Sequence, residues 1–352
     1  MKLTRTQFVV FSIIALLWST GLGFFAYYEI KTPVSFFNAV FGHHSSSDKK
    51  DTTILVFGDM MLDRLVRQKI NENGTGYPFS LIHELLSGND IVFANAEGSF
   101  TNFNSITIGK LSAPLEFTFD PKMLPILKNL GFTLLGQTNN HSLDFGENGF
   151  TESLAAIKAA GIDYVGDPTN KNIVPYVKEI NGEKIAFIGY SEFAYQGLDN
   201  VLAAIRQAKK EFSYIIVYGH WGTEYNFGFT VSQQKAARAF IDAGADMVFA
   251  SHPHVIEPLE IYKNKPIFYS LGNFIFDQSS SGPTSDGLAV RVRLNTNAVQ
   301  YEIIPIFIKY ERASLMDTVS RKETLIDLAK NAIAPETMKE NIAEGIFSLQ
   351  RN

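Results

Sequence analysis

The sequence contains no cysteine among its 352 residues. That absence excludes thiolate metal sites, cysteine nucleophiles, a disulfide framework and a lipidated N-terminal cysteine. Histidine is also scarce, with seven residues in the whole chain. Any metal site must therefore be built from histidine, aspartate, glutamate and asparagine.

The sequence also lacks a surplus of positive charge. Acidic residues number 36 against 31 basic ones, which gives a net charge of -5, and no stretch is rich in lysine and arginine. We therefore expect no nucleic acid among its partners. Charged residues are 19% and hydrophobic residues 45% of the chain, which is enough apolar surface for one large globular domain or two small ones.

A long uncharged run stands near the N-terminus. From Phe8 to Tyr28 there is no charged residue, and a helix of about 21 residues would be about 31 Å long, enough to cross a bilayer. Lys2 and Arg5 precede the run, which favours a cytoplasmic N-terminus and places everything after Glu29 outside. The sequence predicts a single-pass cell-membrane protein whose bulk is extracytoplasmic.

A cleaved signal peptide is the alternative for this run. Signal peptides have a shorter apolar core and end in small residues, whereas Phe24, Phe25, Tyr27 and Tyr28 are bulky. An uncleaved anchor fits better. The expected plan is a cytoplasmic N-terminus at 1–7, a transmembrane anchor at 8–28, a linker at 29–51, a main domain at 52–312 and a C-terminal helical extension at 313–352.

Strand and helix patterns alternate through the main domain. Short apolar runs typical of buried strands occur at Ile54 to Phe57, Ile91 to Ala94, Phe132 to Leu135, Ile185 to Ile188, Tyr214 to Tyr218, Met247 to Ala250 and Pro266 to Tyr269. Helical spacing occurs at Phe79 to Leu86, Pro121 to Leu130, Glu147 to Ala160, Asn200 to Phe212 and Ser232 to Ala243. This alternation predicts an α/β domain with helices covering the sheet.

The pattern changes toward the C-terminus. Leu288 to Leu294 and Val299 to Ile308 read as consecutive strands, which predicts an antiparallel part of the core. The sequence pattern beyond Ser320 predicts one or two helices that close the domain at its C-terminal end.

Polar residues collect where the predicted strands end. In parallel strands the carboxyl ends form one rim, where α/β folds place their ligands. Five separate segments are expected to deliver side chains to that rim, namely Asp59, then Asn95 and Glu97, then Asn139, Asn140 and His141, then His220, and finally His252 and His254.

The residue types at this rim suit a divalent metal. Four of the seven histidines lie there. Imidazole, carboxylate and amide oxygen together suit Mn, Fe or Zn, and a bridging carboxylate can hold two ions that activate water. Pro253 favours an extended backbone at His252, so the imidazoles of His252 and His254 are expected to face the same way.

Each motif alone has an ordinary explanation. Gly58-Asp59 and Asn139-Asn140 fit polar turns, and His220 fits a hydrogen-bonded core histidine. All of these explanations would have to hold together, so the joint pattern favours a metal site.

With these segments laid out, the sequence resembles the CapA family of capsular poly-γ-glutamate synthesis proteins, whose domain is similar to calcineurin-like metallophosphoesterases. The resemblance covers residues 53 to 278 in order. It implies a layered sandwich of two mixed β-sheets flanked by helices. The matching stretches are GDMMLDR (Gly58 to Arg64), NAEGSF (Asn95 to Phe100), NNHSLDFG (Asn139 to Gly146), GHWGTEY (Gly219 to Tyr225), SHPHVIEP (Ser251 to Pro258) and YSLGNFIFDQ (Tyr269 to Gln278).

The resemblance also implies roles for single residues. It makes Asp59 and His254 ligands of a first metal ion and places the Glu97 carboxylate near both ions. Asn140, His220 and His252 would be the ligands of the second ion. His141 would be the acid or the group that stabilises an oxyanion, with Asp144 as its orienting partner. The residues expected to bind substrate or shape its pocket are Arg64, Asn139, Trp221, Glu224, Tyr225, Asn273 and Asp277.

Several of these assignments stay open. Packing or the capping of turns is the alternative role for Trp221, Glu224, Tyr225, Asn273 and Asp277. A structural salt bridge is an equal alternative for Arg64, which otherwise suits an anionic substrate group. The phosphoesterase pattern has Asp, any residue, His at its first motif, but Met60 and Met61 follow Asp59 here. A thioether is a poor ligand for a hard divalent ion, so the first metal site lacks the histidine ligand that the pattern would supply at position 61.

The expected function is capsule polymer (poly-γ-glutamate) biosynthesis, export or tethering through a metal-centred site. If the protein is an enzyme, it would hydrolyse or transfer at a phosphoester or amide bond. The alternatives are a non-catalytic assembly or polymer-binding subunit and a cell-surface metal-dependent phosphodiesterase or nucleotidase. The expected partners are an anionic polymer or small anionic substrate, the membrane, and membrane-bound capsule synthesis subunits.

Overall fold

The computed structural model describes residues 51–110, 115–194, 197–278 and 282–351. The expected anchor at 8–28 and the linker before residue 51 lie outside these residues. Among the described residues, no helix combines the length and the apolar character needed to cross a membrane.

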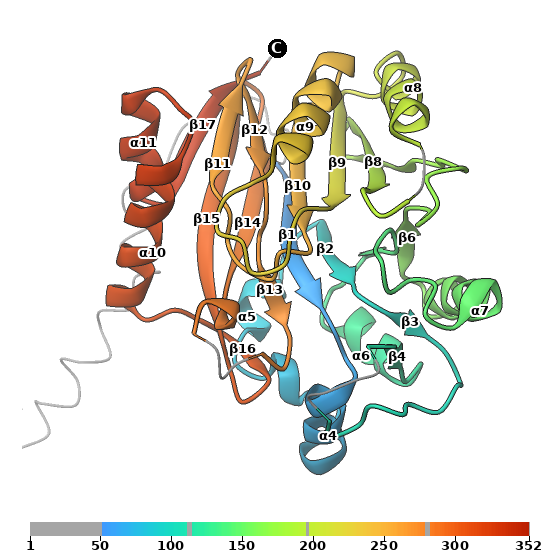
Figure 1. The fold of residues 1–352 in the computed structure, drawn as a ribbon. Helices are drawn as coiled ribbons and strands as arrows, with labels where there is room; N and C mark the ends of the chain where they lie inside the picture. Colours follow the sequence, from blue (N-terminus) through green and yellow to red (C-terminus); the bar gives the residue numbers. More distant parts are fainter. Residues whose placement is uncertain (1–50, 111–114, 195–196, 279–281, 352) are drawn as a thin grey trace, which may run out of the picture. The chain divides into compact units, whose positions relative to one another are not determined.

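In the described part of the chain, two large mixed sheets face each other (Figure 1). The first has the order β16 (Arg312–Leu315), β15 (Ala298–Lys309), β14 (Asp286–Leu294), β1 (Thr52–Met60), β2 (Ile91–Ala96), β5 (Leu134–Gly136) and β6 (Asp163–Val165), with β13 (Asn273–Ile275) on β1 and β17 (Ile346–Gln350) on β15. The second has the order β11 (Leu259–Tyr262), β12 (Lys265–Phe268), β10 (Met247–Ser251), β9 (Tyr214–His220), β8 (Glu183–Ser191) and β7 (Tyr176–Ile180).

Helices and short strands complete the fold around these sheets. The helical elements are α4 (Arg64–Asn73), η1 (Tyr77–Phe79), α5 (His83–Leu86), α6 (Met123–Asn129), α7 (Gly146–Ala159), α8 (Leu198–Ala208), α9 (Val231–Ala243), η2 (Pro283–Ser285), α10 (Thr318–Asn331) and α11 (Glu336–Ala343). A small separate pair consists of β3 (Ser99–Phe100) and β4 (Thr118–Phe119). This α/β sandwich confirms the predicted fold class in its described part.

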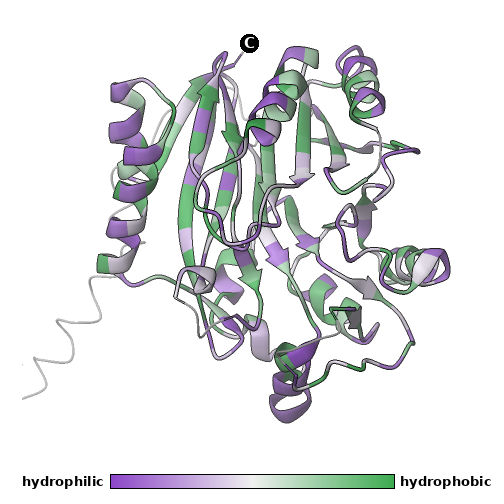
Figure 2. Cartoon of the chain, in the orientation of Figure 1, coloured by the Kyte–Doolittle hydropathy of each residue, from purple (hydrophilic) through white to green (hydrophobic). Residues whose placement is uncertain are grey.

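Both faces of the central strands are buried, which explains their continuous apolar runs. In β1, Leu55 and Phe57 pack into the core under α4 to α6, whereas Ile54 and Val56 pack into the core between the sheets. The outer core of the second sheet is closed by α8 and α9. Figure 2 shows these strands as largely hydrophobic and α10 and α11 as banded with hydrophilic residues.

The last two helices cover an edge of the sandwich. Leu325 and Leu328 of α10 and Ile342 of α11 join the core between the sheets, and Figure 1 shows both helices beside β15 and β17. The chain then ends in β17, which pairs with β15 in antiparallel register. The predicted closing helices are present, and the segment predicted as a helical extension also contains a strand, in which Phe347 and Leu349 alternate as buried residues.

The predicted helix from Phe79 to Leu86 is also wrong in its form. The structure breaks it into η1 and α5, with Ile82 outside helical geometry at φ -127. Leu81 makes a β-bridge to Ser314, so a tertiary contact interrupts the helical pattern here.

Gly58 marks a close approach between β1 and the segment that leads to β13. A Cβ built at Gly58 would lie 1.9 Å from the carbonyl oxygen of Gly272, and the amide of Asp59 donates to the same oxygen at 3.1 Å. We predict that Gly58→Ala lowers the free energy of unfolding by about 1–3 kcal/mol, because the two backbones must separate. Urea denaturation measures this change.

Gly76→Ala is the matched control. A Cβ there meets no atom within 4 Å, and Gly76 has a φ of -80 that any residue adopts. Its effect should stay within about 0.5 kcal/mol. Equal losses in the two variants would contradict the close-approach explanation.

Candidate metal centre

The carboxyl ends of parallel strands from both sheets meet at one place. Asp59 lies near the end of β1, and Glu97 directly follows β2, its parallel neighbour. In the second sheet His220 ends β9, and His252 directly follows β10, again its parallel neighbour. The structure therefore brings together side chains that are spread over almost two hundred sequence positions, as the strand-end pattern predicts.

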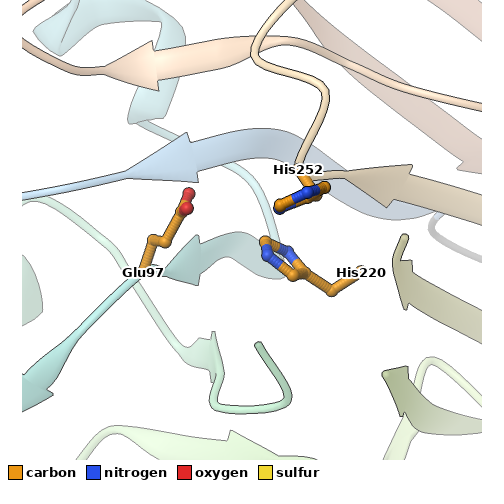
Figure 3. A group of neighbouring side chains, drawn as sticks. All are labelled: Glu97, His220 and His252. Atoms are coloured by element: carbon orange, nitrogen blue, oxygen red, sulfur yellow. The ribbon is translucent and has the colours of Figure 1, made fainter. Parts of the chain in front are cut away.

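Among the residues that the structure describes, two buried groups have ligand atoms within 4.8 Å of one another. One consists of Asp59, Glu97 and His254, and the other of Glu97, His220 and His252. Figure 3 shows the imidazoles of the second group beside each other with the Glu97 carboxylate across from them. Asn140 adjoins this group, since its Oδ1 lies 2.7 Å from Nε2 of His220.

Glu97 has the most informative surroundings. Neither of its carboxylate oxygens, nor Nδ1 of His252, has a hydrogen-bond partner among the described residues, and all three atoms are buried. A buried polar atom without a partner is costly, and native proteins rarely leave one unexplained. Oxygen and imidazole nitrogen are donors for divalent ions, so the donor set fits divalent metal binding.

Burial and charge set the protonation of these groups. Burial, together with the nearby charge of Asp59, raises the pKa of Glu97 well above its ordinary value of 4.5. Burial, together with neighbouring imidazoles, lowers the pKa of His220 well below its ordinary range and that of His252 to about 4. The two imidazoles are therefore neutral at pH 7, which is the form that binds metals.

Asp59 stays ionised although it is completely buried. Burial alone raises its pKa, but a hydrogen bond from His254 and the proximity of His220 outweigh burial and lower the pKa below its ordinary value. Its carboxylate also accepts the amide of Asn95 at 2.7 Å and the backbone amide of His252 at 3.0 Å. The protein thus holds one charged carboxylate beside the one that resists ionisation.

A chain of asparagine amides orients this cluster. Asn139 donates to Oδ1 of Asn95 at 3.0 Å, and its own oxygen accepts the backbone amide of His141, also at 3.0 Å. Asn139 is 1% exposed. These bonds make it a residue that positions its neighbours, and its contact with substrate stays a prediction.

His141 and Asp144 form the expected pair. Nδ1 of His141 lies 2.9 Å from Oδ2 of Asp144, and that oxygen also accepts the backbone amide of Phe117 at 2.7 Å. The Phe117 ring lies 4.3 Å from the imidazole. Charge on His141 contributes to lowering the pKa of His220 and His252, which places this pair next to the metal-competent groups.

The His252-Pro253-His254 segment reaches the centre by an unexpected backbone path. The extended geometry predicted for it is wrong, because His252 has a φ of +103 and His254 a φ of +58. The imidazoles still lie 5.9 Å apart between ring centroids. Asn273 fixes His254 through a contact of 2.9 Å to Nδ1, which leaves Nε2 3.6 Å from Glu97.

Three residues expected to contact substrate have other positions. Trp221 is fully buried in the core under α9 and donates to the Tyr269 carbonyl at 2.8 Å, which agrees with the packing alternative for this residue. Asn273 is likewise fully buried behind His254. Arg64 is 6% exposed and pairs with Asp277 at 3.0 Å, which agrees with the salt-bridge alternative for Arg64.

Exposed side chains form the rim of the centre. Glu224 is exposed, and Tyr225 is 51% exposed with its ring 6.1 Å from that of His254. Phe193, which the sequence reasoning missed, is 46% exposed with its ring 4.4 Å from His252. Phe193 follows β8, so the strand-end pattern that identified the other residues would have found it too.

Met61 contributes no donor atom to the centre. It is completely buried in the core under α4, and its sulfur lies 3.0 Å from the backbone amide of Asp63. The group of Asp59, Glu97 and His254 therefore lacks the histidine that the phosphoesterase pattern has two residues after the first aspartate.

The family model described as "Bacterial capsule synthesis protein PGA_cap" matches residues 53–278. The capsule biosynthesis protein CapA of Bacillus anthracis is 31% identical over 76% of this chain and 69% of its own length. The PGA biosynthesis protein CapA of Bacillus subtilis is 30% identical over 78% of this chain and 77% of its own length.

Among solved structures, the sulfate thiohydrolase SoxB of Thermus thermophilus is 12% identical with a TM-score of 0.42, covering 86% of this chain and 61% of its own. A purple acid phosphatase of yellow lupin is 11% identical with a TM-score of 0.39, covering 77% of this chain and 53% of its own. These structural likenesses are too weak to support an argument. The sequence matches are sufficient, and the chain belongs to the family of bacterial capsule synthesis proteins.

Proposed function

We propose that this protein acts in the synthesis, export or tethering of an anionic capsule polymer, poly-γ-glutamate, through a divalent-metal centre exposed outside the cell membrane. The observation that carries the proposal is the Glu97 carboxylate, which is buried without a hydrogen-bond partner among the described residues and is shared by both metal-competent groups. Family membership supplies the polymer, and the uncharged run from Phe8 to Tyr28 supplies the membrane anchor.

The residues that would hold metal divide between the two groups. Asp59, Glu97 and His254 would hold one ion. Glu97, His220 and His252 would hold a second ion, with Asn140 beside them. A bound divalent ion would act as a Lewis acid on a phosphoester or amide oxygen and would give an anionic polymer a local positive site in a chain of net charge -5.

His141 is the proposed proton donor to the leaving group. Its pairing with Asp144 through Nδ1 leaves Nε2 available for proton transfer and fixes the ring orientation. Asp144 is itself held by the Phe117 amide, so we assign it a positioning role. The reaction would be hydrolysis or transfer at a phosphoester or amide bond.

A second candidate function is a non-catalytic subunit that binds polymer or assembles the capsule machinery. The specific observation in its favour is Met61, which stands where the phosphoesterase pattern has a histidine ligand and whose buried sulfur lies 3.0 Å from the Asp63 amide. The two candidates make opposite predictions for the loss of His141, which only a catalytic protein needs for proton transfer. They make the same prediction for the loss of a metal ligand such as Glu97, because both need the metal centre.

We predict that Glu97→Gln stabilises the metal-free protein at pH 8 by about 1 kcal/mol or more and removes its stabilisation by added metal. The folded pKa of Glu97 lies above that of the unfolded chain, so the folded state binds the additional proton. Stability of the metal-free protein therefore falls as pH rises from 4.5 through the folded pKa. Thermal unfolding of the full chain with and without Mn²⁺ measures both effects.

Glu260→Gln is the matched control, since Glu260 is 1% exposed and pairs with Arg238 at 2.6 Å. This variant should lose stability but keep the response to metal. A wild-type protein that metal does not stabilise, or a Glu97→Gln variant that metal still stabilises, would disprove the metal centre.

We further predict that His141→Ala retains bound metal and loses turnover by about 100-fold or more, the usual size of general acid catalysis. Metal content by mass spectrometry and assays on phosphodiester and γ-glutamyl substrates measure the two properties. His83→Ala is the control, because His83 is exposed on α5 and belongs to neither metal-competent group. If His141→Ala supports polymer formation while Glu97→Gln does not, the catalytic proposal fails and the assembly subunit stands.

A further inference from the structure

Each metal-competent group has a half-exposed aromatic ring beside its histidines. The ring of Phe193 lies 4.4 Å from that of His252 and 5.9 Å from that of His220, measured between centroids. The ring of Tyr225 lies 6.1 Å from that of His254. Phe193 is 46% exposed and Tyr225 51% exposed, whereas the three histidines are buried. The two aromatic rings therefore reach solvent where the candidate ligands do not.

The backbone that carries Phe193 is fixed by the preceding residue, Glu192. The backbone amide of Glu192 donates to the carbonyl of His220 at 2.9 Å. The Glu192 carboxylate accepts the backbone amide of Gly222 at 2.8 Å and the hydroxyl of Ser232 in α9. These bonds join the end of β8 to the end of β9, to the loop that follows it and to α9. The position of Phe193 is therefore set by the protein before any ligand binds.

Tyr225 is fixed at its backbone and at its hydroxyl. It has a φ of +63, a conformation that a residue other than glycine rarely adopts. Its backbone amide donates to the Pro253 carbonyl at 2.8 Å, and its hydroxyl accepts the side-chain amide of Gln278 at 3.0 Å. Residues held in such a conformation cluster at ligand-binding sites, where the surroundings over-determine them. Tyr225 is thus held rigid although half of it is exposed.

Rigid, exposed aromatic rings beside a metal centre suit a ligand with both apolar and anionic parts. Binding to them costs little conformational entropy because the rings are already in place, and aromatic side chains are enriched where proteins bind partners. A γ-glutamyl chain alternates carboxylates with planar amides and methylene groups. The amides and methylene groups can pack on the rings while the carboxylates meet the charge of a bound ion.

We propose that Phe193 and Tyr225 determine substrate specificity by packing against a γ-glutamyl chain, with one ring beside each metal-competent group. The inference rests on the proposed function and adds to it the selection of an amide-linked chain over a phosphodiester chain. A phosphodiester chain without bases has the negative charge but neither planar amides nor pairs of methylene groups between its charges. The two rings therefore stabilise the bound γ-glutamyl chain more than the bound phosphodiester chain.

The test is calorimetric titration of the manganese-loaded full chain with a γ-glutamyl oligomer and, separately, with an abasic phosphodiester oligomer of equal charge. Wild-type protein should bind the γ-glutamyl oligomer. Phe193→Ala and Tyr225→Ala should each weaken this binding by about fivefold or more, the size of a lost aromatic contact. Binding of the phosphodiester oligomer should change by less than about twofold. Bound manganese, measured by mass spectrometry, should stay the same because neither residue belongs to a metal-competent group.

Phe103→Ala is the matched control for the loss of an exposed ring. Phe103 is also 46% exposed, but its ring stacks on that of Phe145 at 5.2 Å between centroids. This variant should bind the γ-glutamyl oligomer like wild type. Tyr225→Phe keeps the ring and removes only the hydroxyl, so it should retain most of the binding that Tyr225→Ala loses.

The possible results separate this inference from the proposed function. If wild-type protein with bound manganese does not bind the γ-glutamyl oligomer, the proposed polymer is wrong and the inference falls with it. If wild-type protein binds the oligomer and both alanine variants bind it equally well, the inference alone is overturned. Equal weakening of both oligomers, or equal weakening by Phe103→Ala, would also overturn it.

Discussion

The buried carboxylate of Asp59 joins the two sheets at the edge where the metal-competent side chains meet. It belongs to β1 of the first sheet, yet it accepts hydrogen bonds from the Ser251 hydroxyl and the His252 amide of the second. Tyr218 adds a second link, since its hydroxyl donates to the Phe57 carbonyl at 3.2 Å. Because an ionised group inside a protein must be fully paired, the relative position of the sheets and the charge of the centre depend on each other.

Strand register then places the remaining groups. Asp59 pairs across the sheet with Asn95 on one side and Asn273 on the other. In the second sheet His220 pairs with Ser251. A shift of one residue in either sheet would turn these side chains to the opposite face, so the apolar packing that fixes register also fixes the donor atoms. The stability of the sandwich and the geometry of the site have a common origin.

Sequence patterns could predict the elements and the rim but not the direction of every side chain. The apolar runs located the central strands because both of their faces are buried, and strand ends located Glu97, His220 and His252. The same rule misplaced Trp221, since position after a strand does not reveal whether a side chain turns outward or into the core under α9. It also could not foresee β17, whose pairing with β15 depends on the fold of the whole chain.

The backbone at His252 and His254 shows the limit of local rules most directly. Pro253 favours extended geometry for the preceding residue, but His252 has a positive φ in the structure. Its amide is held by Asp59 at 3.0 Å, and the Pro253 carbonyl accepts the Tyr225 amide at 2.8 Å. These tertiary bonds offset the cost of a conformation that a non-glycine residue rarely adopts. Backbone strain therefore falls at the segment that supplies two candidate ligands.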